Sequence, residues 1–200
     1  MSNHPYPPYR PRPILVIFLI MPILAMFTAI LISGGSGGAT LTPTPPAATF
    51  AVFSLIDKPA PPFQLASLEG TTIDLGTYRG GWVIVNLWAT WCLPCKEEMP
   101  LLQSFQDGTF AAANDVPGGV RLITINRAED APTIREFMTE LNLSMSVAMD
   151  TDGRVTTNYG GVNLPMTYFI DPEGVVRYRH IGGLRADDLD GYLKAMAERR

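Results

Sequence analysis

Hydrophobic and polar positions follow two different patterns on the two sides of about residue 57. Residues 14–32 form one apolar run without a charged side chain. After residue 57, short apolar runs alternate with amphipathic stretches, which is the pattern of a globular α/β domain. Roughly 140 residues lie in that part, which is enough for one domain core and too few for two typical domains. We therefore expect a single domain preceded by an apolar segment.

Within this domain the periodicity predicts strands and helices in alternation. Residues 82–88 are apolar except for Asn86, as in a strand buried on both faces, so this strand should be central. A βαβ unit comes first and a β-hairpin with a covering helix comes last, which implies a mixed sheet with helices on both faces. Other strands are expected at 63–65, 120–125, 147–149, 166–170 and 175–180, and helices at 94–105, 132–141 and 186–198. The polar stretch up to Gly161 is interpreted as a connection that begins with a turn at 150–153.

The apolar run at 14–32 has the length of a transmembrane helix. As a helix it would rise about 28 Å, close to the roughly 30 Å of a bilayer's hydrocarbon core. Arg10 and Arg12 precede the run and no charge follows it before Asp57, so the positive-inside rule places a cytosolic tail at 1–13 and the domain outside the cytosol. A cleaved signal peptide is the alternative, although its apolar core usually has only about 7–15 residues. A buried core helix is disfavoured because the run is apolar on all sides.

The segment between the apolar run and the domain has a different composition. Residues 33–56 contain mainly Gly, Ser, Thr, Pro and Ala at first and carry no charge. Such a segment cannot bury enough surface to offset the entropy of ordering, so it predicts a flexible linker. The predicted organisation is therefore a tail, an anchor, a linker and a domain at 57–200.

Charge and cysteine count exclude several classes of function. The formal net charge is −4 and no block of Lys or Arg occurs, so the basic face that nucleic acid requires is missing. The two cysteines, Cys92 and Cys95, are too few for a disulfide-stapled scaffold or a four-cysteine zinc site. The two histidines are His4 and His180, and His4 is expected across the membrane from the domain. We expect no metal and no cofactor apart from the cysteines themselves.

Cys92 and Cys95 are three residues apart, where the central strand ends and the next helix begins. Cysteines at this spacing can close a small disulfide, and a helix N-terminus stabilises negative charge on the first sulfur. Cys92 should therefore be the more exposed thiolate that attacks a partner's disulfide, and Cys95 should resolve the mixed disulfide. Inert core cysteines or a structural disulfide are the alternative, but so short a loop would stabilise the fold little.

Two segments resemble the thioredoxin superfamily, in particular its membrane-anchored TlpA-like and ResA-like thiol–disulfide oxidoreductases. They are VIVNLWATWCLPCKEEMP at 83–100 and LPMTYFID at 164–171. The resemblance implies a thioredoxin fold in which Cys92 is the nucleophile and Cys95 the resolving thiol. It also implies that Pro165 is a cis-proline facing the active site, where the adjoining backbone pairs with an incoming peptide.

The residues around these motifs are expected to contact the substrate. The predicted substrate-binding residues are Trp91, Leu93, Pro94, Leu164, Pro165 and Met166. Trp88 and Trp91 flank the cysteines, and both are expected to combine packing with contact to a partner. His180 is interpreted as an ordinary residue at the end of a strand.

One departure from the thioredoxin pattern concerns the proton of the resolving thiol. Cytosolic thioredoxins carry a buried aspartate six residues before the nucleophile, and this chain has Asn86 there, which cannot titrate. ResA-like proteins carry a glutamate with an acid–base role at the position of Glu98, which shares a helix face with Cys95. Apolar cover should raise the pKa of such a carboxyl group. The alternative is an exposed glutamate that only favours the helix dipole, as expected for Glu97.

Together these features predict a membrane-tethered, extracytoplasmic thiol–disulfide oxidoreductase. The resemblance implies that it reduces exported proteins such as apocytochromes c, with electrons from a membrane thiol transporter. The sequence itself does not set the direction, which depends on how far the protein stabilises the dithiol relative to the disulfide. A copper(I) carrier using Cys92 and Cys95, with or without His180, is a second possibility. A third is a peroxiredoxin-like thiol peroxidase, although the threonine it requires three residues before the nucleophile is replaced by Ala89.

Overall fold

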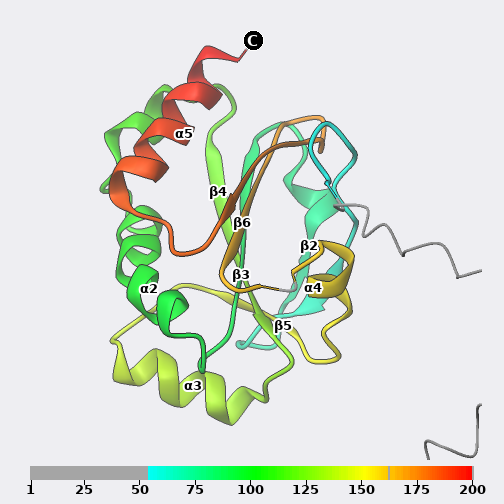
Figure 1. Cartoon of the computed structure of the whole chain (residues 1–200), viewed down its shortest axis with the longest axis vertical. Coiled ribbons are helices and arrows are strands. Elements are labelled where there is room, and N and C mark those ends of the chain that lie inside the picture. The colour runs from blue at the N-terminus through cyan, green and yellow to red at the C-terminus, as the bar shows by residue number, and fades with distance from the viewer. Residues whose placement is uncertain (1–53, 162, 200) are drawn as a thin grey trace, which may run out of the picture. The chain divides into compact units, whose positions relative to one another are not determined.

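A five-stranded mixed sheet forms the centre of the computed structural model, which describes residues 54–161 and 163–199 (Figure 1). The strand order is β5-β4-β3-β6-β7. As predicted, β3 is central, with β4 parallel to it on one side and β6 antiparallel on the other. The strands are β3 (Trp82–Trp88), β4 (Val120–Arg127), β5 (Val147–Asp150), β6 (Met166–Ile170) and β7 (Val176–Ile181).

The three long helices lie on one face of this sheet, and smaller elements cover the other (Figure 1). The β3-α2-β4 and β4-α3-β5 crossovers proceed in the same direction across the sheet, and right-handed crossovers then place both helices on one face. The long helices are α2 (Leu93–Gln106), α3 (Ala131–Glu140) and α5 (Ala186–Glu198). The opposite face carries the hairpin of β1 (Gln64–Ala66) and β2 (Thr72–Asp74), the 3-10 helix η1 (Leu75–Tyr78) and α4 (Arg154–Asn158). A second 3-10 helix, η2, spans Ala111–Asp115.

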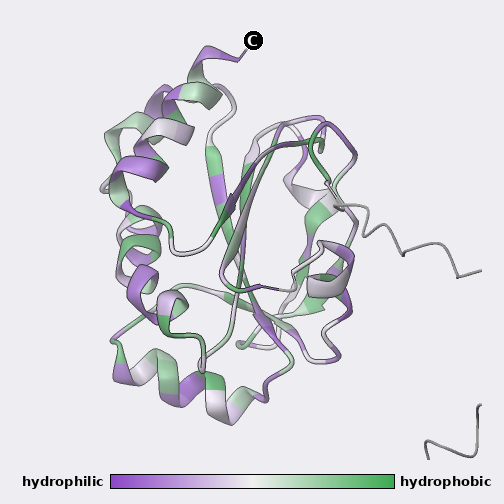
Figure 2. Ribbon diagram, viewed as in Figure 1, coloured by the Kyte–Doolittle hydropathy of each residue, from purple (hydrophilic) through white to green (hydrophobic). Residues whose placement is uncertain are grey.

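Two hydrophobic cores result, one on each side of the sheet. Because successive side chains of a strand point to opposite faces, Ile84 and Trp88 belong to the core under the helices, whereas Val83 and Val85 belong to the other. Figure 2 shows the long helices with hydrophobic and hydrophilic stretches in alternation, as expected for helices with one buried side. All seven residues of β3 are buried, so the strand has the burial on both faces that the sequence predicts.

The main elements agree with the prediction, and the short ones were missed. No element was predicted where β2 lies, and α4 lies in the stretch interpreted as a polar connection. α4 has only five residues, too few to show a helical period, and its start depends on a side chain. The buried carboxylate of Asp150 accepts hydrogen bonds from the backbone N–H groups of Val155 (3.1 Å) and Thr156 (2.8 Å).

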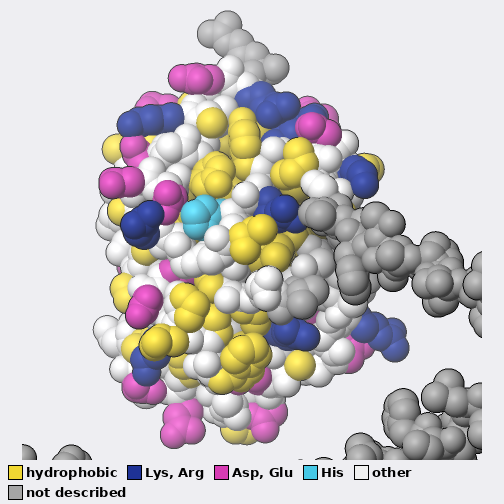
Figure 3. All heavy atoms as spheres, viewed as in Figure 1, with side chains coloured by type: hydrophobic (Ala, Val, Ile, Leu, Met, Phe, Trp, Pro, Cys, Tyr) yellow, Lys and Arg dark blue, Asp and Glu magenta, His cyan; other side chains and the backbone are white. Residues whose placement is uncertain are grey.

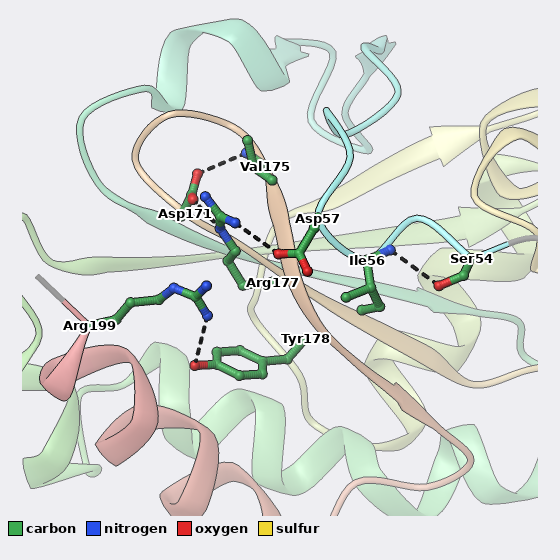
Figure 4. A network of polar contacts seen from close by, with 8 residues as sticks. All are labelled: Ser54, Ile56, Asp57, Asp171, Val175, Arg177, Tyr178 and Arg199. Atoms are coloured by element: carbon green, nitrogen blue, oxygen red, sulfur yellow. Dashed lines mark hydrogen bonds and ion pairs between the residues drawn. The ribbon is translucent and has the colours of Figure 1, made fainter.

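Packing of the domain begins earlier than the predicted boundary at residue 57. Leu55 is buried in the core opposite the long helices. Next to it, Arg177 of β7 forms ion pairs with the buried Asp171 at 2.5 Å and with Asp57 at 2.8 Å, which connects the incoming chain to the last hairpin (Figure 4). Residues 55 and 56 therefore belong to the domain and not to the linker.

The surface of the described part of the chain carries charges of both signs. On the face drawn in Figure 3, Lys and Arg alternate with Asp and Glu, and hydrophobic side chains gather in patches between them. Among residues 54–161 and 163–199, three large apolar residues are exposed: Trp91, Leu93 and Ile181. Across residues 54–161 and 163–199, no helix combines the length and apolar character that a membrane span requires. The span predicted at 14–32 lies outside these residues, as do the tail and most of the linker.

Candidate active site

The two cysteines are joined by a disulfide at the junction between β3 and α2. Cys92 has an extended backbone and occupies the N-cap position of α2, with Pro94 in the first turn. Its Sγ atom accepts a hydrogen bond from the backbone N–H of Cys95 at 3.3 Å. A helix N-terminus that donates to this sulfur favours its negative charge, so Cys92 is the sulfur better suited to be a thiolate.

The exposure of the two sulfurs differs in the expected direction. Cys92 is 5% exposed and Cys95 is fully buried, whereas the neighbouring Trp91 and Leu93 are each 67% exposed. A partner can therefore approach only Cys92, and it meets apolar side chains on both sides of it.

The cis-proline loop lies at the same end of the sheet. The Leu164–Pro165 peptide bond is cis, as the resemblance implies. Leu87 of β3 pairs with Met166 of β6. Pro165, the residue before Met166, therefore lies level with the end of β3. Leu164 is half-buried and Pro165 is buried.

A pair of glycines connects this loop to the cysteine motif. The N–H of Gly182 donates to the carbonyl oxygen of Pro165 at 3.0 Å. A Cβ atom on Gly183 would lie only 3.4 Å from the carbonyl oxygen of Pro94. The Gly182–Gly183 segment thus lies between Pro165 and Pro94, and Gly182 has a φ of +96°, a backbone conformation that favours glycine.

Glu98 is buried one helical turn behind Cys95, with only 2% of its surface exposed. Its Oε1 accepts from Asn86 Nδ2 at 2.8 Å, and its Oε2 accepts from the backbone N–H of Leu184 at 2.6 Å. Burial raises the pKa of Glu98 to about 7, although the hydrogen bonds from Leu184 and Asn86 both favour the carboxylate and oppose this rise. The environment is thus the desolvated one expected for an acid–base group, and Glu97 is exposed as expected.

The comparisons with known proteins identify the family. A model of the AhpC/TSA family matches residues 56–179. The chain belongs to the AhpC/TSA family. The thiol-disulfide oxidoreductase ResA of Oceanobacillus iheyensis is 34% identical over 142 residues, which cover 69% of this chain and 71% of that protein. ResA of Bacillus anthracis is 33% identical over 139 residues, which cover 70% of this chain and 77% of the relative.

A solved structure agrees with these relatives. The thiol:disulfide interchange protein of the thioredoxin family from Chlorobium tepidum is 27% identical and superposes with a TM-score of 0.57. The match covers 70% of this chain and 94% of that one. The chain is therefore a ResA-like member of the AhpC/TSA family with the thioredoxin fold, and it is an enzyme of the thiol–disulfide oxidoreductase class.

Two of the predicted partner contacts need correction for this AhpC/TSA domain. Trp88 is fully buried and packs against Phe137 with 5.1 Å between the ring centroids, so the prediction that it contacts a partner is wrong. Met166 is 4% exposed, and its sulfur accepts a hydrogen bond from the Tyr168 hydroxyl at 2.8 Å. Only the backbone of Met166 remains for contact with a substrate. Both side chains point into the cores because they follow the alternation of β3 and β6.

A second carboxylate, which no sequence motif indicated, lies beside the cysteine loop. Glu129 accepts hydrogen bonds from the backbone N–H and the hydroxyl of Thr90, at 2.8 and 2.5 Å, and from Asn126 Nδ2 at 2.7 Å. Thr90 lies two residues before Cys92, so Glu129 fixes the loop that carries the nucleophile. The parallel pairing of β3 with β4, which brings the ends of both strands together, was the one signal that pointed to this contact.

The described residues contain no cluster of three or more His, Cys, Asp or Glu side chains that could hold a metal. His180 lies in β7, with its ring near Tyr192 of α5. A metal site at Cys92 and Cys95 would therefore have to be made by the two thiolates without a third side chain of these types from the described residues.

Proposed function

We propose that this protein is a membrane-tethered, extracytoplasmic reductase of protein disulfides. The observation that carries the reaction is the arrangement of Cys92, Cys95 and Glu98 along the first turns of α2. It offers one sulfur that a partner can reach, a second sulfur buried behind it, and a carboxyl group with a pKa near neutrality. These are the three groups that a two-step exchange of disulfides requires.

The reaction begins with the dithiol form. The Cys92 thiolate attacks one sulfur of the substrate's disulfide, forming a mixed disulfide and releasing the other substrate sulfur as a thiolate. Cys95 then loses its proton and attacks Cys92, which closes the Cys92–Cys95 disulfide and releases the second substrate thiolate. The released thiolates take up protons. Two electrons pass from the enzyme to the substrate, and a dithiol donor must reduce the enzyme again before the next cycle.

Glu98 is the acid–base group for the second step. Cys95 is buried and becomes a nucleophile only when its proton is removed. With a pKa near 7, Glu98 is ionised in a substantial fraction of molecules at neutral pH and still holds a proton in the rest. Asn86, which replaces the aspartate of cytosolic thioredoxins, contributes by donating its amide hydrogen to Glu98.

The substrates are exported proteins with accessible disulfides, such as apocytochromes c, and the electron donor is a membrane thiol transporter. The likeness to ResA proteins supports this assignment. Recognition involves the exposed Trp91 and Leu93 together with Pro94, Leu164, Pro165 and the backbone of Met166. A peptide bound beside Pro165 can pair with the backbone of that loop.

Equilibration of the full-length protein with glutathione buffers at pH 7, combined with metal analysis, separates the reductase from a copper(I) carrier. We expect the reduced protein to exchange disulfides, to have a reduction potential below that of the substrate proteins, and to contain no stoichiometric copper. A reduced protein that retains one copper per chain and fails to exchange disulfides would contradict the proposal and support the carrier. A high hydroperoxide turnover would support the peroxidase instead.

The location of the domain is a separate part of the proposal. The apolar run at 14–32 and the arginines before it support an uncleaved anchor with the domain outside the cytosol. We expect the expressed protein to remain in membranes with its original N-terminus. Protease added from the extracytoplasmic side should release a soluble fragment by cutting within 33–50. A mature chain that begins within the linker would show that the run is a cleaved signal peptide.

A further inference from the structure

His180 lies at the end of a row of polar side chains that crosses the sheet beneath α2. It is paired with Thr167 of β6, and Thr167 is paired with Asn86 of β3. Residues directly opposite each other on neighbouring strands place their side chains on the same face. Asn86 Nδ2 donates both to Thr167 Oγ1 at 3.0 Å and to Glu98. The imidazole therefore lies on the face of the sheet that holds Glu98.

One peptide group lies between the imidazole and the carboxyl group. The carbonyl oxygen of Gly183 is 3.4 Å from Nε2 of His180, and the N–H of the same peptide, that of Leu184, donates to Glu98 Oε2 at 2.6 Å. Because the amide is conjugated, a positive donor at its oxygen makes its N–H a stronger donor. A proton on His180 thus strengthens the hydrogen bond from the Leu184 N–H to Glu98, because both contacts are made by one planar peptide group.

We propose that His180 is a positioning residue for the proton transfer, and that the charge on its imidazole sets how readily Glu98 takes the proton of Cys95. The imidazolium form favours the Glu98 carboxylate through the Gly183–Leu184 peptide. The neutral imidazole favours the carboxylic acid. This inference rests on the proposed function, since it assigns His180 a part in the acid–base step of that reaction.

The other groups that face this pair do not replace the imidazole as the variable charge. Tyr192 of α5 has its hydroxyl 3.5 Å from His180 Nδ1, and burial raises the pKa of this tyrosine, so it stays neutral near pH 7. Asp188, also on α5, attracts the imidazolium, and the backbone N–H of Arg185 holds the pKa of Asp188 below its ordinary value. Arg185 carries a constant positive charge, and Cys95 faces Glu98 from α2.

Two substitutions with opposite charge test this inference. Disulfide exchange by the full-length protein is measured from pH 5 to 9, with His180→Gln, which is always neutral, and His180→Lys, which is positive throughout. We expect the Glu98-dependent pKa in the rate profile to rise in His180→Gln and to fall in His180→Lys, each by about half a pH unit, because the charge acts through a peptide and is partly solvated. Lys194→Gln, which removes an exposed charge on α5, should leave the profile unchanged. Shifts in the same direction in both variants would indicate a structural role and overturn the inference.

The reciprocal measurement uses the imidazole itself. In full-length protein carrying His4→Gln, His180 is the sole imidazole and its proton NMR titration is directly assignable. Linkage sets the size of this effect. Glu98→Gln should lower the pKa of His180 by the same amount by which a positive charge at His180 lowers the pKa of Glu98. If the His180 pKa is the same with Glu98 and with Glu98→Gln, the coupling is refuted. If the rate profile of the unsubstituted protein shows no Glu98-dependent pKa, the proposed acid–base role fails instead, whatever the imidazole does.

Discussion

Cys95→Ser accumulates disulfide-linked complexes with its substrates, and Cys92→Ser accumulates almost none. Without Cys95, the mixed disulfide at Cys92 forms but has no internal thiol to resolve it. Without Cys92, the remaining Cys95 is fully buried and no partner can reach it. The complexes are counted on non-reducing gels of membranes that express each variant, and we expect at least a roughly tenfold difference between the two, since the barrier for a buried thiol is higher by several RT.

The double substitution of Cys92 and Cys95 is the control for complexes that form through other routes. Equal trapping by both single variants would remove the distinction between nucleophile and resolving thiol. It would then favour a pair of equivalent ligands, as in a copper(I) carrier.

In Glu98→Gln, the rate at which Cys95 resolves the mixed disulfide no longer rises as the pH increases through 7. In the protein with Glu98, the carboxylate forms as the pH increases through about 7, so the fraction of molecules that can accept the Cys95 proton grows over that range. The glutamine variant has no such base, and the resolving step at pH 8 should be slower by about 10²-fold, which is the low end of what a positioned acid–base group contributes. The pKa values of the thiols should fall, because the variant removes a neighbouring negative charge.

The fold should tolerate this change. Asn86 Oδ1 is buried without a hydrogen-bond partner in the described part of the chain, so a flip of that amide would offer an acceptor to the new glutamine. Stopped-flow exchange from pH 5 to 9 measures the profile, and Glu97→Gln on the exposed side of α2 is the matched control. A profile that is the same in Glu98→Gln and in the unsubstituted protein would reduce Glu98 to a buried structural residue and leave the proton to solvent.

The sheet and the positions of the cysteines could be predicted because they depend on local patterns. The apolar run of β3, the Cys-Leu-Pro-Cys motif and the helix after it are contiguous, and a strand followed by a helix N-terminus places the first sulfur at the helix start. Glu98 could be found for the same reason, since it lies on the same helix as Cys95. The cis bond at Pro165 depended on the family resemblance and not on the residues alone.

The remaining features of the site depend on contacts between distant segments. The N–H of Leu184 is 86 positions from Glu98 in the chain, and Glu129 is 39 positions from Thr90. A backbone donor has no sequence signature, and a single glutamate after a strand is too common to indicate a role. Trp88 was expected to contact a partner as well as to pack, because it lies near the cysteines in sequence, but the alternation of β3 turns its ring into the core. Such errors arise where tertiary packing decides the environment of a residue.

The contact between Glu129 and Thr90 gives the nucleophile two points of attachment. On one side Cys92 is continuous with α2, and on the other the loop before it is held by a carboxylate that follows β4. The attacking sulfur therefore has a fixed position. The conformational entropy of ordering its loop is lost once, during folding, and not each time a partner binds.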